Sequence, residues 1–191
     1  MITPSTRSIF LAPVRDEDIS LLWTWRSSDA YRSLCSSRDF FVTREQFVEE
    51  LSKDREGDRH EQYMIVRKRD KLPIGTIFSY GYSECDGHVF VTCFIDTPCV
   101  GKGYGVHATA LFVTYLSLEY GIYKVYMDVY ADNLASLYLL SRFGLREEGR
   151  FAGHRVHRGK RRDVIRLAGF GPSFCKAKAL ALRFGAIEHI L

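Results

Sequence analysis

The stretch "CVGKGYGVHATALFVTYLSLEYG", from Cys99 to Gly121, is the part of the chain that best indicates its fold. It holds three glycines within five positions (Gly101, Gly103 and Gly105), and an apolar pattern with helical spacing follows at once. Upstream, residues 88–96 (HVFVTCFID) are rich in β-branched and aromatic residues and predict a strand. A strand, a glycine loop and a helix in this order predict an anion site. Glycines let the backbone approach a ligand closely, and a helix start offers unpaired N–H groups and partial positive charge.

Two common phosphate-binding patterns fit this loop poorly. A Walker A loop ends in Gly-Lys-Ser/Thr, whereas Tyr104 follows Gly103 here. A dinucleotide fingerprint has G-x-G-x-x-G spacing, whereas these three glycines alternate and lie far from the N-terminus. Two interpretations remain open: a pyrophosphate held by successive backbone amides, and a glycine-rich turn that binds nothing.

The residues "VGKGYGVHATALF" resemble the coenzyme A pyrophosphate loop of the GCN5-related N-acetyltransferases (GNAT), whose pattern is Gln/Arg-x-x-Gly-x-Gly/Ala. Residues 133–149 (NLASLYLLSRFGLREEG) resemble a second motif of that family, and residues 161–170 (RRDVIRLAGF) are similar to its closing strand. The resemblance covers about residues 8 to 170. It fits best the ribosomal-protein-acetylating (RimJ/RimL-type) branch, which also contains acetyltransferases of amino sugars and other small amines. Val100 departs from the family's Arg, Gln or Trp, which weakens the match little because the loop's amides do the binding.

The resemblance implies acetyl-CoA as co-substrate and direct attack of an amine on its thioester. We expect no metal, because no Cys or carboxylate joins His154 and His157 at ligand spacing. The resemblance also implies contacts to the cofactor from the strand, the loop and the next helix, namely from Phe94, Ile95, Val100, Gly101, Lys102, Gly103, Tyr104, Gly105, Val106, Asn133 and Ser136. Asn133 and Ser136 match motif positions, although each also fits a plain helix cap.

The identity of the catalytic acid and base is open at this stage. Many family members place a catalytic Tyr where this chain has Leu140, and Tyr138 is turned about 200° away around a helix. Our candidates for catalysis are Asn133, Ser136, Tyr138 and His88, the last because the ordinary pKa of histidine is closest to neutral.

Composition limits the classes of protein to which this chain can belong. The chain has 191 residues, 46% hydrophobic and 26% charged, with a net charge of +4, which suits one globular domain. Five cysteines without a C-x-x-C pair predict free thiols in a reducing cytoplasm and no zinc site. We find neither a signal peptide nor an apolar run of membrane-spanning length. A basic cluster near residue 159 is a solvated turn, a steering surface for anions, or an RNA contact: Arg155, Arg158, Lys160, Arg161 and Arg162.

The periodicities predict strands over residues 7–14, 63–67, 73–82, 88–96 and 123–130, and a last hairpin that turns near Gly159. Helical patterns cover residues 16–34, 41–54, with a Thr43–Gln46 capping box, and 133–143. The strand at 123–130 must lie parallel to the strand at 88–96, because a helix connects them. With the resemblance, this predicts one α/β (α+β) GNAT-like domain over residues 1–171 and a helical tail over 172–191. The sheet is mixed and mostly antiparallel, its one parallel pair is splayed at the acyl-CoA site, and helices cover both faces.

We therefore expect an acetyl-CoA-dependent N-acetyltransferase, a monomer or homodimer. Its acceptor is a primary amine of a small molecule, such as an amino sugar, or of a protein N-terminus. Two alternatives stay open. One is a non-catalytic acyl-CoA-binding or sensing domain. The other is a ribosome- or RNA-associated protein that uses the basic hairpin, although that hairpin lacks the interleaved aromatics of a nucleic-acid surface.

Overall fold

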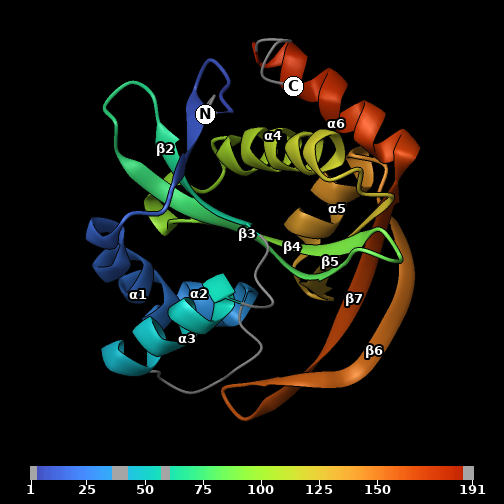
Figure 1. Ribbon diagram of the computed structural model, residues 1–191. Coiled ribbons are helices and arrows are strands. Elements are labelled where there is room, and N and C mark those ends of the chain that lie inside the picture. The colour runs from blue at the N-terminus through green and yellow to red at the C-terminus, as the bar shows by residue number, and fades with distance from the viewer. Residues whose placement is uncertain (1–3, 36–42, 57–60, 187–191) are drawn as a thin grey trace.

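The computed structural model describes residues 4–35, 43–56 and 61–186, and a seven-stranded sheet runs through its centre (Figure 1). The strand order is β1-β2-β3-β4-β5-β7-β6, and β4–β5 is the one parallel pair in it. The strands are β1 (Ile9–Pro13), β2 (Glu61–Arg67), β3 (Pro73–Ser83), β4 (His88–Ile95), β5 (Lys124–Tyr130), β6 (Arg146–His157) and β7 (Lys160–Phe170). The predicted mixed sheet with one parallel pair is confirmed.

Helices cover both faces of the sheet (Figure 1). One face carries α4 (Tyr104–Glu119), α5 (Leu134–Arg142) and α6 (Gly171–Arg183). The other carries α1 (Ile19–Ser27), α2 (Asp29–Leu34) and α3 (Arg44–Glu56). Two short 3-10 turns, η1 (Asp16–Asp18) and η2 (Thr97–Cys99), lead into α1 and into the glycine loop. None of the helices in the described ranges has the length and apolar character needed to cross a bilayer.

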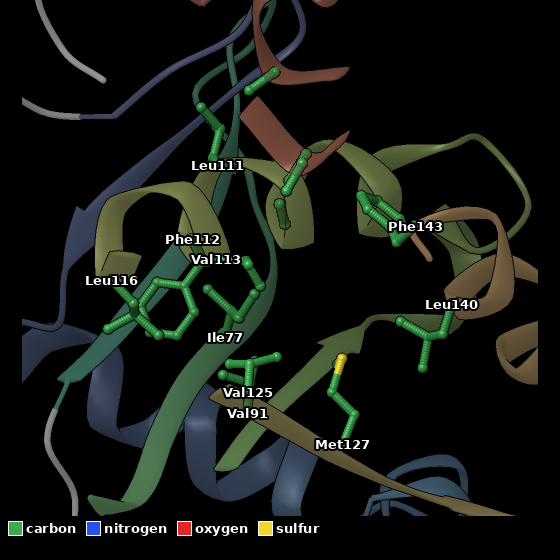
Figure 2. Packing of buried hydrophobic residues seen from close by; sticks show 14 of the residues in the cluster. Ile77, Val91, Leu111, Phe112, Val113, Leu116, Val125, Met127, Leu140 and Phe143 are labelled. Atoms are coloured by element: carbon green, nitrogen blue, oxygen red, sulfur yellow. The ribbon is translucent and has the colours of Figure 1, made fainter. Parts of the chain in front are cut away.

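The larger hydrophobic core lies between the sheet and α4, because the helix's apolar side chains meet those of the central strands (Figure 2). Leu111, Phe112 and Leu116 of α4 are fully buried. They pack with Ile77, Val91 and Val125, which alternate along their strands with residues that point to the other face of the sheet. This core fixes where α4 begins relative to the end of β4, and so it fixes the position of the loop between them.

A second core fills the opposite face and explains the aromatic residues of the first helical region. The rings of Trp25 and Tyr31 lie 5.9 Å and 5.1 Å from that of Phe94 on β4. The helical pattern of residues 16–34 is divided at Ser28, whose backbone is extended (ψ 149°) and whose Oγ accepts a hydrogen bond from the Tyr31 N–H. This side-chain bond offers the backbone an alternative to a continuous helix. α2 therefore starts afresh against Phe94.

The predicted capping box at the start of α3 is confirmed. The Thr43 N–H donates to Gln46 Oε1 at 3.0 Å, and the Gln46 N–H donates to Thr43 Oγ1 at 3.3 Å. The first residues of that predicted helix, 41–42, lie outside the described residues.

The C-terminal helix α6 lies beside α4 and contributes to the larger core. Its Ala177 and Ala181 are buried there. Beyond its end, the ring of Phe184 stacks on His107 of α4 at 3.9 Å, and burial lowers the pKa of that histidine. The Arg7 N–H donates to the Phe184 carbonyl at 2.9 Å, so α4 and both ends of the described chain are held together. The predicted tail over residues 172–191 thus packs on the domain as far as residue 186, and residues 187–191 lie outside the described part.

Candidate active site

The glycine loop leaves the start of α4 open to an anion. Gly101 and Gly103 have φ angles of +78° and +81°, in the left-handed region that other residues rarely adopt. A Cβ atom added at either position would meet nothing within 4 Å, so both face open space. Gly103 is the N-cap of α4, and no side chain caps that helix. The helix N-terminus therefore offers N–H groups and partial positive charge to a ligand.

The two parallel strands separate just beside this loop. Among the described residues, β4 and β5 pair only at His88–Lys124, Val89–Val125 and Phe90–Tyr126. Beyond these positions β4 remains paired with β3 and β5 with β7, so the edges that face each other are left without a strand partner. Such edges present backbone N–H and C=O groups to a ligand that lies between them.

A cavity of about 540 Å³ extends from the glycine loop into this gap. The predicted cofactor residues that line it come from β4, the loop and α5: Phe94, Ile95, Val100, Gly101, Gly103, Tyr104, Gly105, Val106, Asn133 and Ser136. Lys102 is not among the lining residues, and its Nζ donates to the Pro98 carbonyl at 2.8 Å. The structure thus brings together ten of the eleven positions that the resemblance implied.

The four candidates for catalysis lie in different settings. Asn133 caps α5 by accepting a hydrogen bond from the Ser136 N–H at 3.2 Å, and both residues also line the cavity. Tyr138 lines the cavity too, although 68% of the residue is exposed. His88 lies in the paired part of β4, with its ring edge-on to Tyr126 at 5.6 Å, and does not line the cavity. Three of the four therefore surround the gap, and the role of each stays a prediction.

Leu140, at the position where many family members place a catalytic Tyr, is buried against the core and lines the cavity. It offers no proton. Tyr138, two residues earlier on α5, lies at the surface end of the same cavity. The helical offset expected from the sequence is therefore visible in the structure as a difference in burial.

The cavity passes through the sheet. Val89 and Val91 of β4, and Val125 and Met127 of β5, face the core under α4. The alternate residues of each strand consequently face the side of α1 and α2, as the contacts of Phe94 show. The glycine loop therefore lies on the α4 side of the sheet, and the gap joins it to a far wall on the α1 and α2 side, formed by Tyr80, Asp128 and Arg155.

The far wall holds a group of polar residues that sequence reasoning did not assign to the site: Tyr80, Asp128 and Arg155. The Asp128 side chain is only 7% exposed, and its two oxygens accept hydrogen bonds from Arg166 at 2.8 Å and 2.9 Å. Arg155 Nη2 lies 3.7 Å from the Asp128 carboxylate. Burial, and then the charge of Asp128, raise the pKa of Tyr80, so this hydroxyl stays protonated at neutral pH.

Three thiols line the cavity, from Cys35, Cys93 and Cys99, and the first two are held in the neutral form. Burial raises the pKa of Cys35 and of Cys93 to about 12. The Cys35 thiol donates to the Cys93 carbonyl at 3.8 Å. Because the thiolate is the nucleophilic form of cysteine, neither residue is suited to carry an acyl group at neutral pH.

The family model described as Acetyltransferase (GNAT) domain matches residues 8–146. The protein belongs to the GNAT family. No curated protein sequence matches the chain. Solved structures with the same fold include spermidine N-acetyltransferase from Vibrio cholerae in complex with CoA and spermine, at 15% identity and a TM-score of 0.81, over 87% of this chain and 98% of that one.

Two further structures are similar at the level of fold. A GCN5-related N-acetyltransferase from Brucella melitensis is 18% identical, with a TM-score of 0.74, over 95% of this chain and 84% of that one. A GNAT-family acetyltransferase from Bacillus anthracis is 14% identical, with a TM-score of 0.72, over 88% of this chain and 98% of that one.

As a GNAT member, this protein is an acyltransferase. The family's fold accounts for the position of the cavity, because a parallel strand pair that opens beside a helix N-terminus gives both an anion site and free strand edges.

The basic hairpin of β6 and β7 forms ion pairs with other elements of this GNAT domain. Arg158 Nη2 lies 2.9 Å from Asp29 at the start of α2, and Arg162 pairs with Asp132 just before α5. The hairpin therefore joins elements on either side of the cavity.

Proposed function

We propose that this GNAT protein is an acetyl-CoA-dependent N-acetyltransferase that moves the acetyl group directly to a primary amine. The observation that carries the proposal is the single cavity that joins the open start of α4 to the gap between β4 and β5. Its lining runs from the glycine loop to the gap between the strands, which suits a ligand with a phosphate group at one end and a reactive group at the other. Burial raises the pKa of the Cys35 and Cys93 thiols in the cavity, which makes these two residues poor carriers of an acyl group and so supports direct transfer.

In this proposal the loop N–H groups bind the pyrophosphate of acetyl-CoA, and the free edge of β4 pairs with the pantetheine amides. Backbone N–H groups at the point of separation stabilise negative charge on the acetyl oxygen during attack. The amine nitrogen forms a bond to the acetyl carbon and loses a proton to water, the C–S bond breaks, and the departing thiolate takes up a proton. Ser136 and Tyr138 line the cavity and are candidates to donate that proton, whereas Asn133 is a candidate contact to pantetheine.

The acceptor we propose is a primary amine of a small molecule, with an amino sugar as one example and a protein N-terminus as the other class. Assignment to the ribosomal-protein-acetylating branch rests on the resemblance of the two motifs. The Vibrio cholerae structure of the same fold contains CoA and the amine spermine, which supports CoA and an amine as the two kinds of ligand in this proposal. We also propose that the protein works in a reducing cytoplasm, because its five cysteines include no C-x-x-C pair. The oligomeric state we propose is a monomer or a homodimer.

One observation favours a second candidate, a domain that binds acyl-CoA without turnover. The buried Leu140 stands where a proton donor is common, and Tyr138 is largely exposed. Such a domain would keep the CoA site while lacking efficient acetyl transfer.

A thermal-shift titration with CoA and acetyl-CoA, run beside a free-thiol release assay over a panel of amines, separates these functions. A ligand at about 100 times its Kd adds about 2.7 kcal/mol to the free energy of unfolding. A rise in Tm with amine-dependent thiol release supports the transferase. A rise in Tm without release from any amine supports the sensing domain. No rise with either ligand would overturn both.

A further inference from the structure

The far wall of the cavity has more positively charged groups than negatively charged ones. Among the described residues that line the cavity, Asp128 is the one carboxylate and Arg155 the one strongly basic side chain. Arg166 occupies both oxygens of Asp128 in a bidentate pair, with one hydrogen bond to each oxygen. Two guanidinium groups therefore face one carboxylate, and this part of the wall has an excess of one positive charge.

Arg155 is the member of this cluster with binding capacity left. Its Nη2 lies 3.7 Å from Asp128, which is too long for a hydrogen bond and so consumes none of its five N–H donors. Its guanidinium lies 5.8 Å from the centre of the Tyr130 ring, and its side chain is 16% exposed. A partly buried guanidinium that lines a cavity suits a planar, negatively charged group, because its donors match two oxygens at once.

The position of Arg155 relative to the separating strands sets where such a group would lie. The last pair of β4 and β5 is Phe90–Tyr126, and Asp128 follows two residues later, roughly 7 Å along the strand. Arg155 lies beside Asp128, on the face of the sheet away from the glycine loop. A negative group held by Arg155 is therefore close to the place where an amine meets the thioester. A polyamine, in contrast, would meet in the described lining only a carboxylate that Arg166 already occupies.

We propose that Arg155 binds an acidic group of the acceptor, so that the acceptor is an amine with a carboxylate close to its reactive nitrogen, an amino acid, rather than a polyamine. This inference rests on the proposed acetyl transfer and narrows its acceptor to a substrate class. Arg155 is then a specificity-determining residue. Arg166 fixes the orientation of Asp128 through its two hydrogen bonds, and this pair holds the wall beside Arg155 in place.

Matched acceptors test the proposal. L-amino acids and their C-terminal amides have almost the same shape and differ in the negative charge, and spermidine serves as the polyamine probe. CoA binding is first established by thermal shift. Thiol release is then measured at saturating acetyl-CoA, and kcat/KM is expressed per concentration of free amine. For the best amino acid, we expect kcat/KM at least about tenfold above that of its amide, since a charged hydrogen-bonded pair contributes this much or more.

Variants show whether Arg155 is the cause. In Arg155→Gln, kcat/KM for the best amino acid should fall at least about tenfold, through the KM of the acceptor, while the amide stays within about twofold. The KM of acetyl-CoA should not change. Arg155→Lys should recover part of the loss. The control is Arg150→Gln on the same strand, whose guanidinium pairs with Asp163 and does not line the cavity. It should retain the wild-type preference.

Several results would overturn the inference. Amides used as well as acids, spermidine preferred to both, or CoA binding without thiol release from any amino acid would each do so. An equal loss for acid and amide in Arg155→Gln would assign Arg155 a purely structural role. If CoA and acetyl-CoA fail to raise Tm, the proposed transferase fails first, and this inference fails with it.

Discussion

Replacing Gly103 by Val separates the stability of the fold from the binding of CoA. Gly103 has φ +81°, and an added Cβ would meet no protein atom within 4 Å. The cost to the free energy of unfolding is therefore conformational, about 1–2 kcal/mol for a non-glycine residue in this region. For a chain of 191 residues, each kcal/mol lowers Tm by about 2–4 °C. We expect a folded variant with Tm about 2–8 °C below that of the wild type.

The effect on CoA should be much larger than the effect on the fold. The valine side chain enters the open space where the pyrophosphate is expected and turns the N–H groups at the start of α4 away from it. Loss of two charge-assisted hydrogen bonds, at about 1.5 kcal/mol or more each, weakens binding at least about 100-fold. At a CoA concentration of 100 times the wild-type Kd, the wild type gains about 2.7 kcal/mol of stability, and the variant gains about 0.4 kcal/mol.

The assay is differential scanning fluorimetry with and without CoA. The matched control is Gly121→Val at the other end of α4, where φ is +59° and an added Cβ also meets nothing within 4 Å. This control should lose similar stability and keep the full rise in Tm with CoA. If Gly103→Val keeps the wild-type rise, or if both variants lose it equally, the assignment of the glycine loop to the pyrophosphate is refuted.

Three further predictions test the site and the core. Asn133→Asp retains a cap acceptor for the Ser136 N–H, so Tm should stay within a few degrees of the wild type. Because the variant loses the side-chain amide that we propose as a pantetheine contact, the KM of acetyl-CoA should rise about five- to tenfold. An unchanged KM means that Asn133 only caps α5. Leu111→Ala removes a fully buried side chain of α4 and should cost about 2–5 kcal/mol in chemical denaturation. Leu118→Ala on the same helix, at a residue 52% exposed, should cost less than about 1 kcal/mol, and equal costs would contradict the described core (Figure 2). Iodoacetamide at pH 8 should modify the exposed Cys85 and Cys175 well before Cys35 and Cys93, whose pKa of about 12 leaves almost no thiolate. Peptide mass spectrometry can follow the order, and rapid modification of Cys93 would contradict its raised pKa.

Those parts of the fold that depend on local patterns could be predicted from the sequence. The glycine loop, the strand before it and the helix after it follow from residues that are neighbours in the chain. The same holds for the capping box at Thr43 and Gln46 and for the cap at Asn133. The parallel pairing of β4 and β5 also follows, because a helix must connect them. The break at Ser28 is harder to predict, since it depends on one side-chain hydrogen bond within an otherwise helical pattern.

The far wall of the cavity could not be predicted in the same way. Asp128, Arg155 and Arg166 come from three strands and meet only through the registers of β5 with β7 and of β7 with β6. The β6–β7 register contains irregularities near Gly149 and Arg155, which no periodicity in the sequence specifies. One local signal was available. Tyr126, Asp128 and Tyr130 alternate with apolar residues that face the core, so Asp128 must face the opposite side of the sheet.

The central claim is that this cavity transfers an acetyl group from CoA to an amine, and the stoichiometry of the reaction tests it most directly. Wild-type protein is incubated with acetyl-CoA and each amine. Free CoA thiol and N-acetylated amine are then measured in the same sample, by a thiol reagent and by mass spectrometry. We expect both products to appear with at least one amine, in equal amounts and in proportion to the enzyme. Thiol released without an acetylated amine, or no release from any amine by protein that binds CoA, would contradict the claim.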